Sequence, residues 1–243
     1  MDYDSVFTER ASDYNYITKK YPHVLTNELR TAANMIEAQS NDTVVNIPGG
    51  CEDISIYLPT TITYKAYETN KIFADLTNTT YTDTFIIPEP DESVDKVISL
   101  TSLHHATDEE RQQFYKEAYR CLKPNGKMII GDVLQGSRQD SWLNKFVNLY
   151  NGHCGKFWSI NDQELMHGFT VKTELKTYPW TFTSKEEMIE FVGYLFGVKN
   201  ASDIEIYNGL NEYLLAGETE FEWSLLYFIA SKSTMNLTSS PTP

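Results

Sequence analysis

Short apolar runs alternate with amphipathic stretches through the middle of the chain. Runs at 44–47, 94–100 and 127–133 are typical of buried strands, because each is short, rich in apolar residues and bounded by turn-forming residues. Residues 108–122 lie between the last two runs, and their helical stripe consists of Phe114, Ala118, Cys121 and Leu122. Strands and helices at this spacing predict a parallel sheet with right-handed crossovers.

The beginning of the chain has a different pattern, which is helical throughout. In a helix expected over about 26–38, one face consists of Leu29, Ala32, Ala33 and Ile36. We expect residues 1–40 to form a helical cap over the sheet edge or the ligand cleft. The alternative is a helix pair that only packs against the sheet.

Residues 41–233 are expected to form the α/β domain, with further strands at 169–178 and 221–231. The aromatic-rich segment 180–217 would form a lid inserted before the last strand, and a satellite core is the alternative. The polar residues 234–243 are predicted to be a flexible tail.

The stretch 44–52, Val-Val-Asn-Ile-Pro-Gly-Gly-Cys-Glu, predicts a strand, a glycine turn and a helix over 52–58. Such a turn presents backbone N–H groups and the helix dipole to a ligand, although many glycine turns only reverse the chain. A second strand, 62–67, ends at Glu68, where a carboxylate can accept both hydrogen bonds of a ribose. An exposed strand-end glutamate is the alternative. A third strand is expected at 81–87.

Three segments together resemble one family. They are Asp95-Lys96-Val97-Ile98-Ser99, Leu103-His104-His105, and the stretch from Tyr119 to Ile130 that contains Arg-Cys-Leu-Lys-Pro-Asn-Gly. They are similar to the class I S-adenosylmethionine-dependent methyltransferases, in their small-molecule branch, over roughly residues 43–133. The resemblance implies a doubly wound, Rossmann-like sheet of seven mostly parallel strands, with the last strand antiparallel between the fifth and sixth.

The resemblance also implies S-adenosyl-L-methionine as the cofactor. The cofactor-binding positions that it implies are Asn46, Pro48, Gly49, Gly50, Glu68, Thr69, Asp83, Thr84 and Leu100. Three residues depart from the family pattern: Asn46 replaces an acid, and Pro48 and Glu52 replace glycines. Proline lacks an N–H donor, and Glu52 would repel the methionine carboxylate, so we expect weakened cofactor binding.

Histidines are the candidate catalytic residues. Methyl transfer is an in-line displacement, and a base is needed only when the nucleophile carries a proton at neutral pH. His104 and His105 follow the fourth strand, and His153 lies in the loop Asn151-Gly152-His153-Cys154-Gly155. The alternative for each is a structural histidine that hydrogen-bonds to the backbone. The sequence shows no metal-ligand spacing, so no metal is expected.

The composition of the chain limits the classes of molecule that it is expected to bind. The net charge of −14 argues against nucleic acid and anionic membranes, because both attract basic surfaces. The three cysteines form no CxxC pair, and no apolar run reaches the ~18 residues of a membrane span. We expect a soluble cytoplasmic protein with a small-molecule substrate, free or borne by a carrier protein. The oligomeric state stays open.

The resemblance implies an O- or N-methyltransferase that acts on a small metabolite, for example in secondary metabolism. Two alternatives follow from the altered glycine loop. One is the same fold used for a non-methylating reaction, such as that of a cyclase or dehydratase, and the other is a non-catalytic interaction protein.

Overall fold

The computed structural model describes residues 3–50 and 53–233. Within them, the strands form one seven-stranded sheet in the order β3-β2-β1-β4-β5-β7-β6. The strands are β1 (Thr43–Asn46), β2 (Thr63–Glu68), β3 (Thr80–Tyr81), β4 (Val94–Leu100), β5 (Leu122–Asp132), β6 (Phe169–Thr181) and β7 (Glu220–Lys232).

The directions of the strands confirm the predicted fold class. β1 pairs in parallel with β2 and β4, β2 with β3, and β4 with β5. β7 is antiparallel to both β5 and β6 and lies between them. The strand order reverses at β1 and β4, and ligands of such sheets bind outside the carboxyl ends of the strands at this point.

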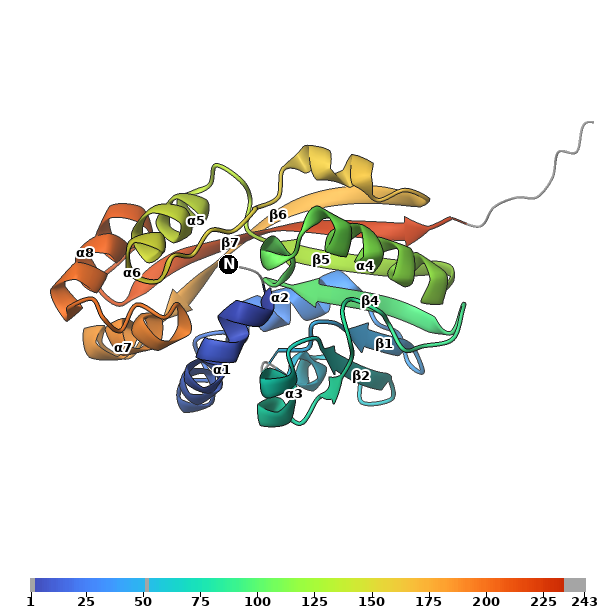
Figure 1. Ribbon diagram of the computed structural model, residues 1–243, viewed down its shortest axis with the longest axis horizontal. Coiled ribbons are helices and arrows are strands. Elements are labelled where there is room, and N and C mark those ends of the chain that lie inside the picture. The colour runs from blue at the N-terminus through green and yellow to red at the C-terminus, as the bar shows by residue number, and fades with distance from the viewer. Residues whose placement is uncertain (1–2, 51–52, 234–243) are drawn as a thin grey trace, which may run out of the picture.

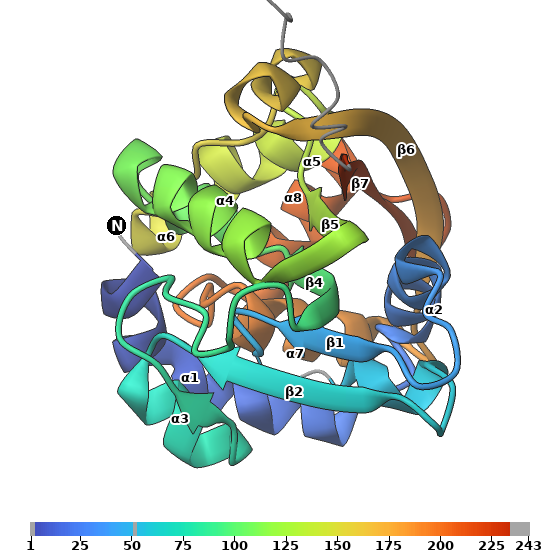
Figure 2. The same cartoon turned by 90° about the vertical axis from the view of Figure 1, so that its right-hand side faces the viewer.

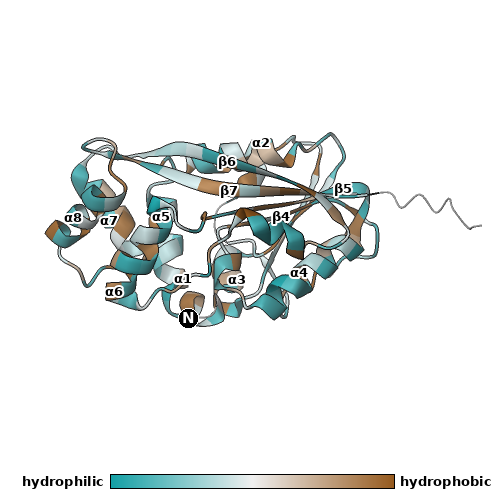
Figure 3. Ribbon diagram, turned by 90° about the horizontal axis from the view of Figure 1, so that it is seen from above, coloured by the Kyte–Doolittle hydropathy of each residue, from teal (hydrophilic) through white to brown (hydrophobic). Residues whose placement is uncertain are grey.

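Helices cover both faces of the sheet (Figures 1 and 2). They are α1 (Tyr3–Lys20), α2 (Thr26–Ile36), α3 (Lys71–Thr77), α4 (Asp108–Cys121), α5 (Arg138–Ser141), α6 (Asn148–Asn151), α7 (Lys185–Leu195) and α8 (Asp203–Tyr213). Seen from above, α2 lies on one side of the sheet and α4 on the other (Figure 3). A π-helical segment, Trp142–Val147, joins α5 to α6.

The core divides into two clusters because successive strand residues point to opposite faces. Val97 and Met128 belong to the cluster that contains the α4 residues Phe114 and Ala118. The next residues along these strands, Ile98 and Ile129, belong to the cluster that contains α2 and α7 residues. Both faces of the central strands are therefore buried, as their nearly continuous apolar runs indicated.

α4 begins and packs as its sequence indicates. The Thr107 hydroxyl accepts a hydrogen bond from the Glu110 N–H, and the Glu110 carboxylate accepts one from the Thr107 N–H. This capping box satisfies two N–H groups that would otherwise lack partners. Phe114, Ala118 and Cys121 of the predicted stripe are buried.

The helix predicted over 52–58 is wrong for the residues that are described. Only a single 3₁₀ turn forms, Ile54–Tyr57, and the Asp53 side chain caps it. β-Branched Ile54 and Ile56 weaken a helix, and Pro59 favours an extended conformation at Leu58. Cys51 and Glu52 lie outside the described residues, as does the predicted tail.

The third strand is shorter than predicted. β3 ends at Tyr81, and a turn follows in which Thr84 has a φ of +55°. The Thr82 hydroxyl donates to the Ile86 carbonyl oxygen at 2.9 Å, so this segment bonds to itself instead of extending the sheet.

Segment 180–217 contributes α7 and α8, beside the ends of β6 and β7 (Figure 1). Phe182, Phe191 and Leu210 of this segment belong to the same buried cluster as residues of α2 and β7. The segment therefore shares the main core of this face. None of the helices in the described ranges is long and apolar enough to cross a membrane.

Candidate active site

Two adjoining cavities lie at the carboxyl ends of the central strands. The loop cavity is lined by Asn46, Pro48, Gly49, Gly50 and Leu100 among others. The histidine cavity is lined by all three candidate catalytic histidines. Both cavities are lined by Phe7, Tyr14, Glu28 and Thr101, so the two cavities form one continuous site.

The glycine loop follows the end of β2 so closely that one position has no room for a side chain. A Cβ atom on Gly49 would lie 3.1 Å from the Ala66 Cβ and 3.2 Å from the Tyr67 carbonyl oxygen. The Gly49 N–H donates to that same oxygen at 2.6 Å. Gly50 has a φ of +57°, which glycine adopts readily. Both glycines are therefore explained by the path of the loop.

Asn46 ends β1 and offers an acceptor to the loop cavity. Its Nδ2 donates to the Tyr64 hydroxyl at 3.0 Å, while its buried Oδ1 has no hydrogen-bond partner among the described residues. Buried polar atoms normally have partners. An ammonium or amide N–H of a bound molecule would supply the missing donor.

Glu68 is fully buried, so the alternative of an exposed strand-end glutamate is wrong. Its Oε1 accepts hydrogen bonds from the N–H groups of Thr69 and Asn70, at 2.8 and 2.9 Å. Its Oε2 accepts one from the Gly50 N–H at 3.0 Å. The carboxylate thus joins the glycine loop to the end of β2. It lines neither cavity, and its ribose-binding role stays a prediction.

Three other predicted cofactor residues lie away from both cavities. Asp83 and Thr84 are exposed in the turn after β3, and Thr69 lines neither cavity. The early end of β3 explains why Asp83 and Thr84 lie away from the cavities, because the chain turns before it reaches the switch point of the sheet.

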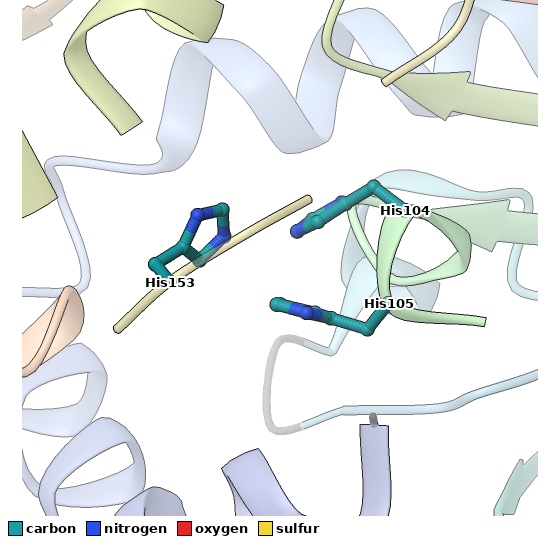
Figure 4. A group of neighbouring side chains, drawn as sticks. All are labelled: His104, His105 and His153. Atoms are coloured by element: carbon teal, nitrogen blue, oxygen red, sulfur yellow. The ribbon is translucent and has the colours of Figure 1, made fainter. Parts of the chain in front are cut away.

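The three histidines meet although 48 residues separate His105 from His153. His104 and His105 form the 3₁₀ turn Leu103–His105 after β4, and His153 comes from the loop after α6. Their ring centroids lie 4.1 to 5.7 Å apart, and all three side chains are buried. The rings point toward one another (Figure 4).

Hydrogen bonds hold the two segments together. The Lys156 N–H donates to the His104 carbonyl oxygen at 2.9 Å. The Arg111 guanidinium donates to the carbonyl oxygens of Leu103 and Lys156, one from each segment. A Cβ atom on Gly155 would lie only 3.1 Å from the His104 Cδ2, so glycine permits the close approach of the loop to His104.

Asp132, at the end of β5, orients His104. The Asp132 carboxylate is fully buried, and its Oδ1 lies 2.8 Å from the His104 Nδ1. It also accepts hydrogen bonds from the backbone N–H groups of His104 and Val133. A carboxylate accepts, so the His104 Nδ1 carries a hydrogen, and Nε2 is the acceptor atom of the neutral ring. Sequence reasoning missed Asp132, although its position at the end of a buried strand was a signal.

Burial sets the protonation of the other two rings. It lowers the pKa of His105 well below 6.5, and repulsion from His104 and His153 adds to the effect. Burial together with the neighbouring His104 and Arg10 lowers the pKa of His153 to about 3. Both imidazoles are therefore neutral at pH 7.

Glu28 of α2 is a second residue that sequence reasoning missed. It is buried, it lines both cavities, and its Oε2 accepts a hydrogen bond from the Trp180 indole N–H at 3.2 Å. The signal was present, because Glu28 precedes Ala32 by one helical turn and so lies on the apolar face of the helix.

A family model described as a methyltransferase domain matches residues 61–130. A solved structure of an S-adenosylmethionine-dependent methyltransferase from Thermotoga maritima matches with a TM-score of 0.56. It is 18% identical, and the match covers 95% of this chain and 100% of that one. Residues 61–130 therefore match a methyltransferase domain, and the chain has the class I methyltransferase fold.

Two further proteins are similar to this chain. The phosphoethanolamine N-methyltransferase 2 of Haemonchus contortus, solved with phosphomonomethylethanolamine and S-adenosylhomocysteine, is 14% identical with a TM-score of 0.59, over 96% of this chain and 61% of that one. At these identities the structures show a shared fold only. The 27-O-demethylrifamycin SV methyltransferase of Amycolatopsis mediterranei is 43% identical over 54 residues, which is 22% of this chain and 19% of that relative's length.

Proposed function

We propose that the chain transfers a methyl group from S-adenosylmethionine to a hydroxyl or amino group of a small molecule. The observation that carries this proposal is the continuity of the two cavities, one lined by the glycine loop and the other by the histidines. Methyl transfer needs the donor and the acceptor side by side, because most of its catalysis is proximity and orientation.

The residues of the loop cavity fit the cofactor. The unpartnered Asn46 Oδ1 would accept a hydrogen bond from the methionine ammonium. Asn46 carries no charge, and we propose that Glu28, which lines the same cavity, supplies the negative charge for this ammonium. Gly49 and Gly50 line the same cavity without side chains. The bound cofactor would supply an electrophilic methyl group.

The histidine cavity would hold the acceptor. Phe7, Leu143, Phe196 and Trp223 contribute apolar wall, which favours a largely apolar molecule with few polar groups. Trp180, Leu195 and Phe196 come from the segment 180–217, so we propose that this segment closes over the substrate. The proton of the nucleophile would leave at the histidine cluster.

Two observations concern the kind of substrate and the way it is presented. The similarity to the 27-O-demethylrifamycin SV methyltransferase supports a secondary metabolite as substrate, through a stretch of 54 residues. The histidine cavity borders the loop cavity directly, so an acceptor held there, free or on a carrier protein, would lie beside the donor.

Calorimetric titration with S-adenosylmethionine and S-adenosylhomocysteine tests cofactor binding, and a panel of aromatic alcohols and amines tests transfer. We expect saturable binding of one cofactor per chain, and formation of S-adenosylhomocysteine with at least one acceptor. Binding without turnover, together with conversion of an acceptor to an isomer or a dehydrated product, would favour the non-methylating alternative. No binding of either compound would contradict the proposal.

A further inference from the structure

We propose that His104, His105 and His153 form a binding site for one divalent transition-metal ion, of the zinc or cobalt type. One nitrogen from each of the three rings lies within 4.8 Å of the nitrogens of the other two. Ligands of a tetrahedral zinc ion lie about 2.0–2.1 Å from the metal, so the rings need to move together by only about 1 Å. In Figure 4 the three rings point toward one another, as rings that bind one ion would.

The unpartnered nitrogens of the cluster support the inference. The Nδ1 atoms of His105 and His153 are buried and have no hydrogen-bond partner within the described part of the chain. Buried polar atoms normally have hydrogen-bond partners. Three imidazole rings, brought together among Phe7 and Phe157, would have no packing advantage over apolar side chains. A bound ion explains both their identity and their meeting.

Asp132 completes the arrangement. Its carboxylate fixes the Nδ1–H tautomer of His104, so that Nε2 can donate its lone pair to an ion. Histidines that bind metals usually donate their other N–H to a carboxylate or carbonyl oxygen in this way. Arg111 bonds to both histidine-bearing segments and Gly155 leaves space for the His104 ring, so the site is largely built before an ion enters.

The chemistry of the ligands selects the ion. Imidazole nitrogens suit zinc, cobalt, nickel and copper, whereas magnesium and calcium prefer oxygen ligands. Three protein ligands leave at least one coordination position open, as in catalytic zinc sites. This position would face the histidine cavity, where Arg10 also lies. Since Arg10 is a cation, we expect an anionic oxygen of the substrate at the open position.

Metal binding is measured without cofactor or substrate, so its outcome is independent of the proposed methyl transfer. The full chain is freed of metal with a chelator and titrated with Co²⁺, whose visible absorption reports coordination by nitrogen, and bound Co²⁺ is then displaced by Zn²⁺. We expect saturation at one equivalent. X-ray absorption of the Zn²⁺ form should show three imidazole nitrogens at about 2.0–2.1 Å.

Variants test which residues bind the ion. His153→Ala should lower the affinity for Co²⁺ at least 10-fold, and Asp132→Asn, which leaves all three ligands in place, should lower it about 10- to 100-fold. The exposed His167→Ala is the matched control and should bind as the wild type does. Circular dichroism checks that each variant is folded. The Co²⁺ absorption spectrum of the wild type tests metal binding even if a variant fails to fold. Absence of stoichiometric binding by the wild type, fewer than three imidazoles around the ion, or equal loss in His167→Ala would overturn the proposal.

Discussion

At the scale of single residues, the loop cavity lacks an acid at the end of β1 but contains a carboxylate from α2. Asn46 occupies the place where the family resemblance implies an acid, and it keeps the acceptor oxygen but not the charge. Glu28, far away in the sequence, brings a carboxylate to the same cavity. A hydrogen bond to a charged group contributes about 1.5–3 kcal/mol. In the proposed complex, the Glu28 carboxylate would therefore restore much of the affinity for the methionine ammonium.

Glu28→Gln should therefore weaken S-adenosylmethionine binding by about 10- to 150-fold, since 1.4 kcal/mol corresponds to a tenfold change. Calorimetry measures the dissociation constant. Glu37→Gln, an exposed change just after the end of the same helix, is the control and should leave binding unchanged. An unaltered dissociation constant in Glu28→Gln would remove Glu28 from the cofactor site.

At the scale of elements, buried carboxylates connect loops to strands. Glu68 bonds to the glycine loop, and Glu89 joins the segment before β4 to β2 through the Lys65 ammonium and the Tyr67 hydroxyl. Burial alone would raise the pKa of Glu89, but the hydrogen bonds from Lys65 and Tyr67 outweigh it, so its pKa is lowered from 4.5.

Glu68→Gln should lower the free energy of unfolding by about 1–3 kcal/mol, because the glutamine NH₂ group would face backbone N–H donors. Urea denaturation at pH 7 measures the change. An exposed acid on α4, Glu109, provides the control variant Glu109→Gln, which should stay within about 0.5 kcal/mol of the wild type. Equal stability of Glu68→Gln and the wild type would show that these three N–H groups do not depend on the carboxylate.

The lowered pKa of Glu89 predicts a pH dependence of stability. Above about pH 4.5 the carboxylate is ionised in both states and its bonds stabilise the fold. As the pH falls through the lower pKa of the folded state, protonation removes this contribution. The stability difference between wild type and Glu89→Gln should be full at pH 7 and shrink below pH 4.5. A difference that stays constant from pH 7 to pH 3 in urea denaturation would contradict the assignment.

At the scale of the whole molecule, local patterns predicted the elements but not the contacts between them. The strand at 94–100, the helix that became α4 and the antiparallel last strand follow from periodicity or family resemblance, and all are present. The helix at 52–58 failed because Pro59 and two isoleucines disfavour it locally. The meeting of His153 with His104, and of Glu28 with the glycine loop, depends on tertiary packing that no local pattern encodes.

The loop cavity is the proposed cofactor site, and a crystal structure with S-adenosylhomocysteine tests this assignment most directly. We predict that the compound lies in the loop cavity, with its amino group at the Asn46 Oδ1 and near the Glu28 carboxylate, and its sulfur toward the histidine cavity. Strong density for the compound elsewhere on the molecule, with the loop cavity empty, would contradict this assignment.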